Sequence, residues 1–345
     1  MGLVVIFIPS VPNSPLSIDA HEEIWPLRQP FRISRGSRTE AQIVVLTVRD
    51  GKHIGRGEGV PLARYNQSIA SVLAQIESIQ ADKTLNRQSL QGLLPAGAAR
   101  NALDCALWDL EAKTSAQRAW ELANIPIAPE VETSFTISLD TPEKMGEAAS
   151  TAAFAQGFGV PRILKLKLGG DDPDLARIEA VRGVRPNARL LIDANESWSP
   201  EHYQKIVPAL KQLGVELIEQ PFPAKADEVL ETLDHPIPVC ADESCHTTGD
   251  LPHLTNRYEV INVKLDKTGG LTEALRLCER ARDGGFKLLI GCMVCTSLGI
   301  APARLLASFA SWIDLDGPLL LARDRDRPVP YANGRIGIPP RNLWG

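Results

Sequence analysis

The spacing of apolar residues changes near residue 132 and divides the chain into two regions. After this point, short apolar runs alternate with segments of helical periodicity as far as residue 313. Residues 133–139 are the first run, and the Thr-Pro-Glu sequence at 141–143 then begins a helix, with threonine as its cap and proline at its first position. Repeated units of this kind form a parallel sheet through right-handed crossovers. The pattern therefore predicts an α/β fold for this second region.

The first region has the pattern of a sheet followed by helices. Its apolar runs are rich in β-branched residues, and the hairpin signal Asp50-Gly51 separates them. Helical periodicity follows, so we expect a small α+β domain here. The strands are expected at residues 41–48 and 53–58, and the helices at residues 68–81 and 96–113.

Three acidic residues, Asp193, Glu219 and Asp242, each end an apolar run. Together with Lys264 they recur about every 22–26 residues, which is the length of one strand plus one helix. In a parallel β/α barrel the carboxyl ends of the strands meet at one mouth, so these groups should converge. A doubly wound open sheet is the alternative, but it usually binds ligands at a single switch point. Functional groups at the ends of at least five strands favour a TIM-like (β/α)7–8 barrel.

Chain length agrees with this division. The chain has 345 residues, whereas a barrel alone takes about 250. The remainder suits a capping domain, which we expect to be formed by the N-terminal region together with the proline-rich C-terminal tail. The predicted segments are an N-terminal extension at 1–21, an α+β capping domain at 22–128, the β/α barrel at 129–318, and a C-terminal segment at 319–345 that returns to the capping domain.

Charge and cysteine content narrow the possible functions. The formal net charge is −5, which disfavours nucleic acid or anionic membranes as partners. The six cysteines are scattered, as expected for free thiols in a reducing cytoplasm. The apolar stretch at residues 2–11 lacks a basic leader and contains proline, so we expect neither secretion nor membrane insertion. The expected location is the cytoplasm.

The three acids at the strand ends predict a metal site. Carboxylates without a histidine or cysteine among them offer the oxygen ligands of a hard divalent cation, and they favour Mg²⁺ over zinc. One such acid alone could be a surface or capping residue, but this explanation does not suit three acids at strand-matched spacing. We expect one Mg²⁺ per subunit, bound by Asp193, Glu219 and Asp242.

Lysines lie on both sides of these acids in the sequence. Lys165 and Lys167 alternate with leucines in one apolar run, so both should face the barrel interior. A buried lysine needs a partner or a chemical task, and pairing with the barrel carboxylates is the structural alternative. If a substrate is held between Lys167 and Lys264, one lysine can remove a proton from one face and the other can return it to the opposite face. This exchange inverts a stereocentre.

The bond concerned would be a C–H bond next to a carboxylate. Its proton is only weakly acidic, and its loss produces a dianionic enediolate, so positive charge must surround the carboxylate oxygens. Mg²⁺ and the ammonium of Lys165 would supply that charge. The same field should lower the pKa values of Lys167 and Lys264 toward neutrality, so that one of them can act as a base.

Five motifs resemble those of the enolase superfamily, in its muconate lactonizing enzyme subgroup. The resemblance covers nearly the whole chain from about residue 22. It implies that the three acids bind the metal, that Lys167 and Lys264 are the acid/base residues, and that Lys165 lies near the substrate carboxylate. The motifs are Lys165-Leu-Lys167, Asp193-Ala-Asn195, Glu219-Gln-Pro221, Ala241-Asp-Glu-Ser244 and Asn262-Val-Lys264-Leu-Asp-Lys-Thr-Gly-Gly270.

A sixth motif, Ile313-Asp-Leu-Asp-Gly-Pro318, resembles the Asp-x-Asp motif of the dipeptide epimerases within that subgroup. Asp314 and Asp316 would face the same way, and they could hold the free α-ammonium of a dipeptide. A simple turn at Asp316-Gly317 is the alternative.

Residues 30–39 carry three arginines on a loop that we expect over the barrel mouth. The similarity to L-Ala-D/L-Glu epimerases is close here, and it implies that an arginine of this loop binds the side-chain carboxylate of the epimerised glutamate. Arg38 is the first candidate and Arg35 the second, because the guanidinium fork suits a carboxylate. An exposed arginine without a ligand is the alternative.

Two further residues complete the expected substrate site. Cys292 forms a Cys-x-x-Cys pair with Cys295, a spacing known from redox and zinc half-sites, but no second pair stands nearby. We therefore expect Cys292 to line the substrate pocket at the end of the seventh strand. Thr136, on the first barrel strand, is the other expected substrate-binding residue.

The predicted activity is a Mg²⁺-dependent epimerisation of the C-terminal residue of a dipeptide. L-Ala-L-Glu and L-Ala-D-Glu are the favoured substrates, which suggests a role in recycling murein peptides. Other reactions of the superfamily remain open, namely o-succinylbenzoate synthesis, N-acylamino-acid racemisation and cycloisomerisation. A non-catalytic metal-binding barrel is the alternative from another class. The expected partner is the small dipeptide, and a homo-oligomeric assembly is left open.

Overall fold

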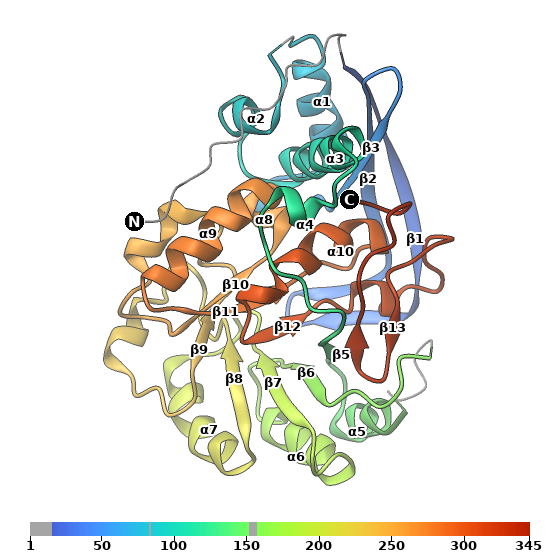
Figure 1. The fold of residues 1–345 in the computed structure, drawn as a ribbon. Coiled ribbons are helices and arrows are strands. Elements are labelled where there is room, and N and C mark those ends of the chain that lie inside the picture. The colour runs from blue at the N-terminus through green and yellow to red at the C-terminus, as the bar shows by residue number, and fades with distance from the viewer. Residues whose placement is uncertain (1–15, 83, 152–156) are drawn as a thin grey trace.

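Two sheets of different kinds dominate the protein (Figure 1). The computed structural model describes residues 16–82, 84–151 and 157–345, so residues 1–15 of the expected N-terminal extension lie outside the described residues. The second region of the chain forms an eight-stranded parallel sheet, and the first region forms a three-stranded antiparallel sheet with its own helices. No helix in the described part of the chain is long and apolar enough to cross a membrane.

The parallel sheet is a barrel, as the sequence predicted. Each strand pairs with the next one along the chain. The first and last strands also meet, since Ser134 Oγ donates to Asp314 Oδ1 at 2.5 Å and Leu315 N donates to Thr133 Oγ1 at 2.9 Å. The strands are β5 (Ser134–Ile137), β6 (Ile163–Lys167), β7 (Arg189–Asp193), β8 (Val215–Glu219), β9 (Val239–Ala241), β10 (Val260–Val263), β11 (Lys287–Gly291) and β12 (Trp312–Asp314).

Helices in the connections surround the barrel. α5 (Pro142–Thr151) begins at the proline that the sequence placed at its first position. After β8 and β9 the connections hold only the 3₁₀ helices η3 (Glu228–Thr232) and η4 (Thr248–His253), so the alternation is less regular than predicted. Pro252 lies inside η4 and lacks the backbone donor that a longer helix would need there. The other elements are α6 (Asp174–Val184), α7 (Pro200–Gln212), α8 (Leu265–Thr268), α9 (Leu271–Asp283), α10 (Ser297–Ala303), η5 (Arg304–Phe309) and η6 (Gly317–Leu320).

The alternation along each strand separates an apolar layer from a charged layer inside the barrel. Lys165 and Lys167 have the same parity as Ile163 and point inward with it. By the same rule Asp193 lies one layer above Leu191. The apolar layer therefore fills the barrel below the mouth, and charged groups gather at the mouth. The apolar layer contains one residue from each of β6–β12, namely Ile163, Leu191, Leu217, Cys240, Val260, Leu289 and Trp312.

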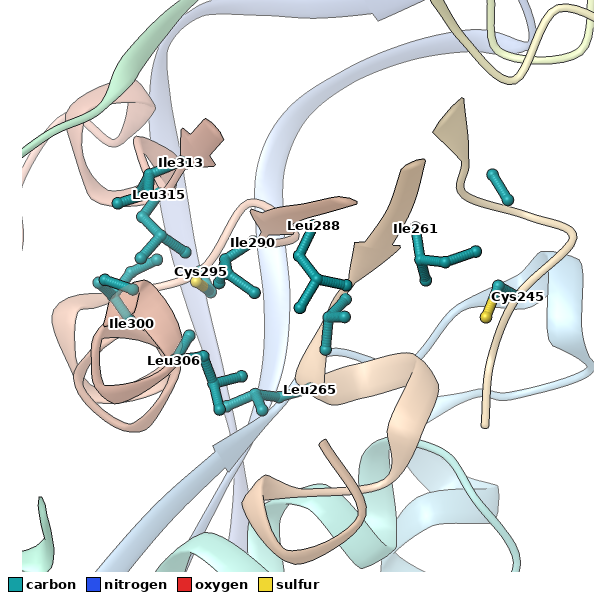
Figure 2. Close-up of a cluster of buried hydrophobic side chains, with 14 of the residues drawn as sticks. Cys245, Ile261, Leu265, Leu288, Ile290, Cys295, Ile300, Leu306, Ile313 and Leu315 are labelled. Atoms are coloured by element: carbon teal, nitrogen blue, oxygen red, sulfur yellow. The ribbon is translucent and has the colours of Figure 1, made fainter. Parts of the chain in front are cut away.

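Residues of opposite parity pack outward against the surrounding helices (Figure 2). Ile261 of β10 and Ile290 of β11 belong to one buried cluster with Leu265 of α8, Ile300 of α10 and Leu306 of η5. Both faces of these strands are thus buried, which holds the strand ends in fixed positions.

The first region folds as the predicted hairpin and helices. The antiparallel sheet is formed by β1 (Ser17–Ile33), β2 (Gly36–Arg49) and β3 (Ile54–Gly59), and α3 (Ala98–Ser115) crosses its face. Glycines on β3 allow close contact, because a Cβ on Gly57 would lie only 1.9 Å from the carbonyl oxygen of Ala102. The remaining elements are η1 (Ala63–Tyr65), α1 (Ile69–Ile79), α2 (Arg87–Leu93) and α4 (Ala119–Leu122).

The first strand begins earlier than expected. The sequence placed the start of the fold near Glu22, yet β1 begins at Ser17 and pairs with the end of β2. Polar residues interrupt the apolar pattern here and leave no clear strand signal in the sequence. In the structure, Leu16, Ile18 and Ala20 pack against the buried cluster under α1 and α3. At its other end, the β1–β2 hairpin turns at Ser34 and Arg35, over the barrel mouth.

The C-terminal residues return to the first region. β13 (Tyr331–Ala332) pairs with β14 (Arg335–Ile336), and β14 pairs with β4 (Val131–Glu132). Beyond them, Trp344 Nε1 donates to the carbonyl oxygen of Cys105 at 3.0 Å, and Gly345 N donates to Asp109 Oδ1 at 2.7 Å, so the tail ends on α3. These contacts agree with a discontinuous capping domain, whose boundaries stay a prediction.

Candidate active site

A cavity of about 370 Å³ lies between the barrel mouth and the first region of the chain. Strand-end residues form its floor, and the β1–β2 turn and the segment around η1 form its other side. Asp193 and Glu219 are buried beneath this floor, where they contact lysines that line the cavity. The predicted site residues that line the cavity are Arg35, Arg38, Thr136, Lys165, Lys167, Asp242, Lys264, Cys292, Asp314 and Asp316.

Asp193, Glu219 and Asp242 form a compact carboxylate cluster, which we call the acid triad. Asp193 and Glu219 are paired neighbours at the ends of β7 and β8, and Asp242 follows β9. One oxygen of each residue lies within 4.8 Å of the other two. Glu219 Oε2 and Asp242 Oδ1 are buried and accept no hydrogen bond, although each lies 2.7 Å from a lysine nitrogen. Hard oxygen donors with unused lone pairs fit a divalent cation such as Mg²⁺.

Crowding shifts the pKa values of the triad in different directions. Burial, with the nearby charge of Asp193, raises the pKa of Glu219 to about 7. Burial would also raise the pKa of Asp193, but Lys167 and Lys165 lower it. The pKa of Asp242 lies well below its usual range, because neighbouring lysines outweigh its burial. The triad therefore concentrates negative charge, and nearby cations are needed to stabilise that charge.

Three buried lysines balance part of the negative charge of the triad. Lys165 Nζ lies 2.7 Å from Glu219 Oε2 and 3.4 Å from Asp193 Oδ2. Lys167 Nζ lies 2.5 Å from Asp193 Oδ2, and Lys264 Nζ lies 2.7 Å from Asp242 Oδ2. Lys167 ends β6 and Lys264 follows β10, and three strands separate these two strands in either direction around the barrel. The two lysines therefore reach the triad from opposite sides.

The predicted lowering of the lysine pKa values rests on the field of a bound cation, and it stays a prediction. Burial would lower the pKa of Lys264, but Asp242 and Glu219 raise it well above its usual range. A cation shared by the triad would weaken this attraction and move the pKa of Lys264 downward.

A fourth lysine near the triad was missed from the sequence. Lys267 Nζ lies 2.7 Å from Asp242 Oδ1 and also donates to the carbonyl oxygens of Asp242, Cys245 and Asn262. All four oxygens surround one buried ammonium, so Lys267 holds Asp242 in place. Its position three residues after Lys264 was the available signal, but α8 turns it back under the loop after β9.

Gln220 was also missed, although it directly follows Glu219. Its Oε1 accepts hydrogen bonds from Asp242 N at 2.8 Å and Ser244 N at 3.1 Å. Its Nε2 donates to Phe222 O at 2.9 Å, and its side chain is fully buried. One amide thereby connects the backbone next to two members of the acid triad.

Asp314 and Asp316 both line the cavity at the end of β12. Asp314 Oδ2 lies 2.7 Å from Lys165 Nζ, and this charge lowers the pKa of Asp314 despite its burial. Asp316 Oδ2 accepts a hydrogen bond from Thr136 N at 2.6 Å, and burial together with Asp314 raises the pKa of Asp316 to about 7. The Asp316 side chain does not cap η6, so a turn alone does not account for its position.

The two candidate arginines differ in their partners. Arg35 donates to the carbonyl oxygen of Asn195 at 2.6 Å, to Glu196 at 3.0 Å and to Glu243 at 2.6 Å. The side chain of Arg38 lines the cavity and makes no hydrogen bond or ion pair with any residue that the structure describes. Arg35 is thus occupied by the protein, whereas Arg38 remains available to a ligand.

Cys292 and Thr136 lie on the cavity wall. Cys292 is partly exposed there, and Cys295 is buried behind it; both are free thiols. Thr136 is buried on β5, and its backbone N–H positions Asp316.

Two family models match the chain. The model "Enolase C-terminal domain-like" matches residues 144–342, and "Mandelate racemase / muconate lactonizing enzyme, N-terminal domain" matches residues 16–123. The chain belongs to the mandelate racemase/muconate lactonizing enzyme family of the enolase superfamily. The resemblance predicted from the sequence motifs is confirmed, and so is the barrel with its capping sheet.

Individual members of this family are similar over almost the entire chain. An L-Ala-D/L-Glu epimerase of Escherichia coli (strain K12) is 47% identical over 93% of this chain and 99% of that protein. An N-acetyl-D-glutamate racemase of Pseudoalteromonas sp. is 44% identical over 88% of this chain and 95% of that protein. A solved enolase family member from Agrobacterium tumefaciens, with homology to dipeptide epimerases and with bound sodium, L-Ala-L-Glu and an ordered loop, is 46% identical. Its TM-score is 0.90, over 96% of this chain and 100% of that chain.

Proposed function

We propose that the protein is a Mg²⁺-dependent dipeptide epimerase that interconverts L-Ala-L-Glu and L-Ala-D-Glu, and that it serves the recycling of murein peptides. One observation carries the proposal: Lys167 and Lys264 reach the acid triad from opposite sides of the barrel mouth. This arrangement stands in a chain that resembles an L-Ala-D/L-Glu epimerase over nearly its full length.

The acid triad would hold Mg²⁺. The metal ion would supply positive charge next to the C-terminal carboxylate of the dipeptide, where negative charge develops during the reaction. Lys165 would add a second positive charge. Its pKa is raised well above the usual range, because Asp314 and Glu219 outweigh its burial, and it therefore stays an ammonium group.

Lys167 and Lys264 would move the proton. One lysine takes the α-proton of the glutamate residue, and the electron pair of the C–H bond passes into the adjacent carboxylate as an enediolate. The other lysine then donates its proton to the opposite face of the α-carbon, which re-forms the C–H bond with inverted configuration. Each lysine acts as the base for one diastereomer and as the acid for the other.

The two ends of the dipeptide would be held by groups of opposite charge. Asp314 and Asp316 would receive the α-ammonium, beside Thr136 and Cys292 on the wall. Arg38 would bind the glutamate side chain, because it faces the cavity without a partner among the described residues. Fixing both ends leaves the α-carbon between the two lysines, which supplies the required orientation.

Racemisation of an N-acylated glutamate is the second candidate, favoured by the similarity to an N-acetyl-D-glutamate racemase. Such a substrate has the same side chain and carboxylate but no free α-ammonium. The variants Asp314→Asn and Asp316→Asn separate the two reactions. Each should reduce turnover of L-Ala-L-Glu by about tenfold or more through loss of a charged hydrogen bond, and intact turnover would favour the N-acyl substrate.

A screen in D₂O tests the proposal directly. A library of L-Ala-L-Xaa dipeptides, together with N-acetyl-glutamate, is incubated with the protein and Mg²⁺, and the gain in mass at the α-carbon is measured. We expect strong labelling of L-Ala-L-Glu and none after treatment with EDTA. Preferred labelling of dipeptides with apolar or cationic second residues would contradict the role of Arg38 and leave the epimerisation intact. No exchange with any substrate would support a non-catalytic barrel.

A further inference from the structure

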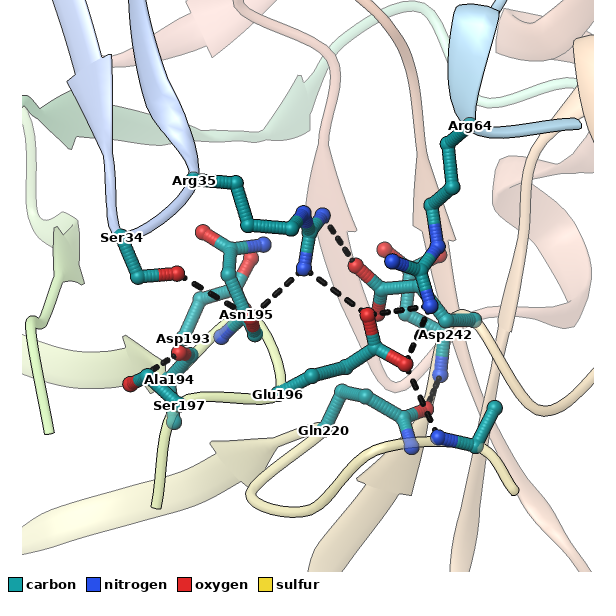
Figure 3. A network of polar contacts seen from close by, with 12 residues as sticks. Ser34, Arg35, Arg64, Asp193, Ala194, Asn195, Glu196, Ser197, Gln220 and Asp242 are labelled. Atoms are coloured by element: carbon teal, nitrogen blue, oxygen red, sulfur yellow. Dashed lines mark hydrogen bonds and ion pairs between the residues drawn. The ribbon is translucent and has the colours of Figure 1, made fainter.

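The side chain of Glu196 connects three segments of the protein around the cavity (Figure 3). Its Oε2 accepts a hydrogen bond from Arg35 of the β1–β2 turn at 3.0 Å. Its Oε1 accepts one from Arg64 of η1 and one from Ala224 N, at 2.8 Å, in the loop after β8. Only 5% of the Glu196 side chain is exposed. A single buried carboxylate thus joins two segments of the first region to two loops of the barrel mouth.

The backbone next to Glu196 has a costly conformation. Asn195 and Glu196 have φ values of 46° and 66°, in the left-handed region that glutamate rarely adopts. In this conformation the carbonyl oxygen of Asn195 accepts hydrogen bonds from Arg35 at 2.6 Å and from Ser34 Oγ at 3.1 Å. Such a conformation persists where the surrounding contacts stabilise it. The backbone carbonyl of Asn195 and the side chain of Glu196 therefore both bind the β1–β2 turn.

A second buried carboxylate strengthens the attachment of the turn. Arg35 also donates to Glu243 at 2.6 Å, and only 3% of the Glu243 side chain is exposed. The Arg35 side chain is itself 34% exposed, but removing it would leave the buried Glu243 carboxylate without this charged partner, which is unfavourable. The turn is consequently held against the barrel by contacts that differ from loose surface ion pairs.

We propose that Glu196 is a positioning residue that fixes the β1–β2 turn over the barrel mouth so that Arg38 faces the cavity. Arg38 lies three residues after Arg35 on the same hairpin, and its side chain has no partner of its own among the described residues. Arg32 of this hairpin is also held, by Ser138 Oγ at 2.6 Å and Asp140 Oδ2 at 2.8 Å, so Arg35 anchors the turn itself, nearer to Arg38. The effect on catalysis rests on the proposed function, whereas the anchoring of the turn does not.

Limited proteolysis tests the anchoring without any substrate. Trypsin cleaves after arginine, and the hairpin carries Arg32, Arg35 and Arg38. In Glu196→Gln we expect cleavage in this segment to accelerate by at least about tenfold, the factor that loss of one charged hydrogen bond gives. Arg35→Gln removes the other member of the same ion pair, and it provides a second test in case Glu196→Gln fails to fold. Because this variant lacks the cleavage site at residue 35, cleavage is measured after Arg38.

Glu216→Gln is the matched control. Glu216 forms an ion pair with Arg189 at 2.7 Å at the opposite end of the barrel strands, so its loss should leave hairpin cleavage unchanged. Unchanged cleavage in both Glu196→Gln and Arg35→Gln would overturn the proposal.

Kinetics then test the route through Arg38. With L-Ala-L-Glu, Glu196→Gln should raise KM by about tenfold and change kcat by less than about threefold, because the turn contributes to substrate binding and not to proton transfer. Glu196→Asp should recover part of the loss. In an Arg38→Gln background the same substitution should change kcat/KM by less than about twofold, since Arg38 can no longer be positioned.

The outcomes separate this proposal from the proposed function. Equal effects of Glu196→Gln with and without Arg38 would overturn the positioning role. If the hairpin opens in Glu196→Gln but the wild-type protein does not epimerise L-Ala-L-Glu, the anchoring is supported and the proposed substrate is rejected.

Discussion

Replacement of Gln220 by methionine should destabilise the protein and weaken Mg²⁺ binding at the same time. The buried amide of Gln220 accepts hydrogen bonds from Asp242 N and Ser244 N, and its Nε2 lies within hydrogen-bond distance of Phe222 O and the Ser244 and Tyr258 hydroxyls. Methionine keeps the length and approximate volume of the side chain, so the substitution removes hydrogen bonds without opening a large cavity.

The structure sets the expected magnitude. Two buried N–H groups and one carbonyl oxygen would lose their side-chain partner, while the Ser244 and Tyr258 hydroxyls would keep their bonds to Asp227. An unsatisfied buried group costs about 1–3 kcal/mol. With partial relaxation, the free energy of unfolding should fall by about 3–6 kcal/mol. Gln220 lies next to Glu219 and fixes the backbone of Asp242, so the dissociation constant for Mg²⁺ should rise by about 10–100-fold.

Urea unfolding of the metal-free protein and calorimetric titration with Mg²⁺ measure the two effects separately. Gln42→Met on β2 is the control, because the Gln42 side chain is exposed and, among the described residues, bonds only to the nearby Glu40. This substitution should change stability by less than about 0.5 kcal/mol. A loss of stability below about 1 kcal/mol would refute the hydrogen-bond argument. Normal Mg²⁺ affinity in a clearly destabilised variant would refute the link between Gln220 and the acid triad.

Three further predictions address the lysines, the buried acids and the metal. Lys167→Met and Lys264→Met should each slow epimerisation by about 10²–10⁴-fold. Each variant should still exchange the α-proton of one diastereomer, because the remaining lysine faces that proton. NMR in D₂O measures the exchange, and its loss for both diastereomers in both variants would contradict opposite-face transfer. Asp316→Asn should flatten the pH dependence of stability in the metal-free protein between about pH 4 and 7. In the wild type the folded state keeps the Asp316 proton up to about pH 7 and the unfolded state releases it near 3.8, so stability falls as the pH rises through this window; parallel urea-unfolding curves for both proteins would contradict the raised pKa. Mg²⁺ should raise the thermal unfolding temperature in a concentration-dependent way, because it binds the folded state, and Asp193→Asn should abolish this shift in a thermal melt.

The barrel could be predicted from the sequence because its signals are local. Apolar runs, a regular interval between strand ends and inward parity place Lys165, Lys167 and Asp193 at one mouth, whatever the surrounding helices do. The start of β1 at Ser17 was missed because the packing of Leu16 and Ile18 depends on α1 and α3, which lie far along the chain.

The supporting residues of the site could not be predicted in the same way. Gln220 and Lys267 act on Asp242 through contacts between neighbouring strands and loops, and no spacing rule specifies such contacts. The choice between Arg35 and Arg38 depended on Glu196 and Glu243, whose positions relative to the hairpin follow only from the docking of the first region on the barrel.

The two parts of the site should therefore respond differently to substitution. The acid triad and its lysines lie at strand ends that are buried on both faces, and we expect changes there to alter proton transfer for every substrate. The group that would bind the substrate side chain lies on a hairpin turn whose Arg35 pairs with two buried carboxylates, Glu196 and Glu243. A substitution of Arg38 should change which dipeptide is processed while α-proton exchange continues. A substitution of Lys167 or Lys264 should slow the epimerisation of every dipeptide and leave their order of preference unchanged. Under the proposed function, reaction and substrate preference would thus depend on structurally separate elements, joined at Glu196.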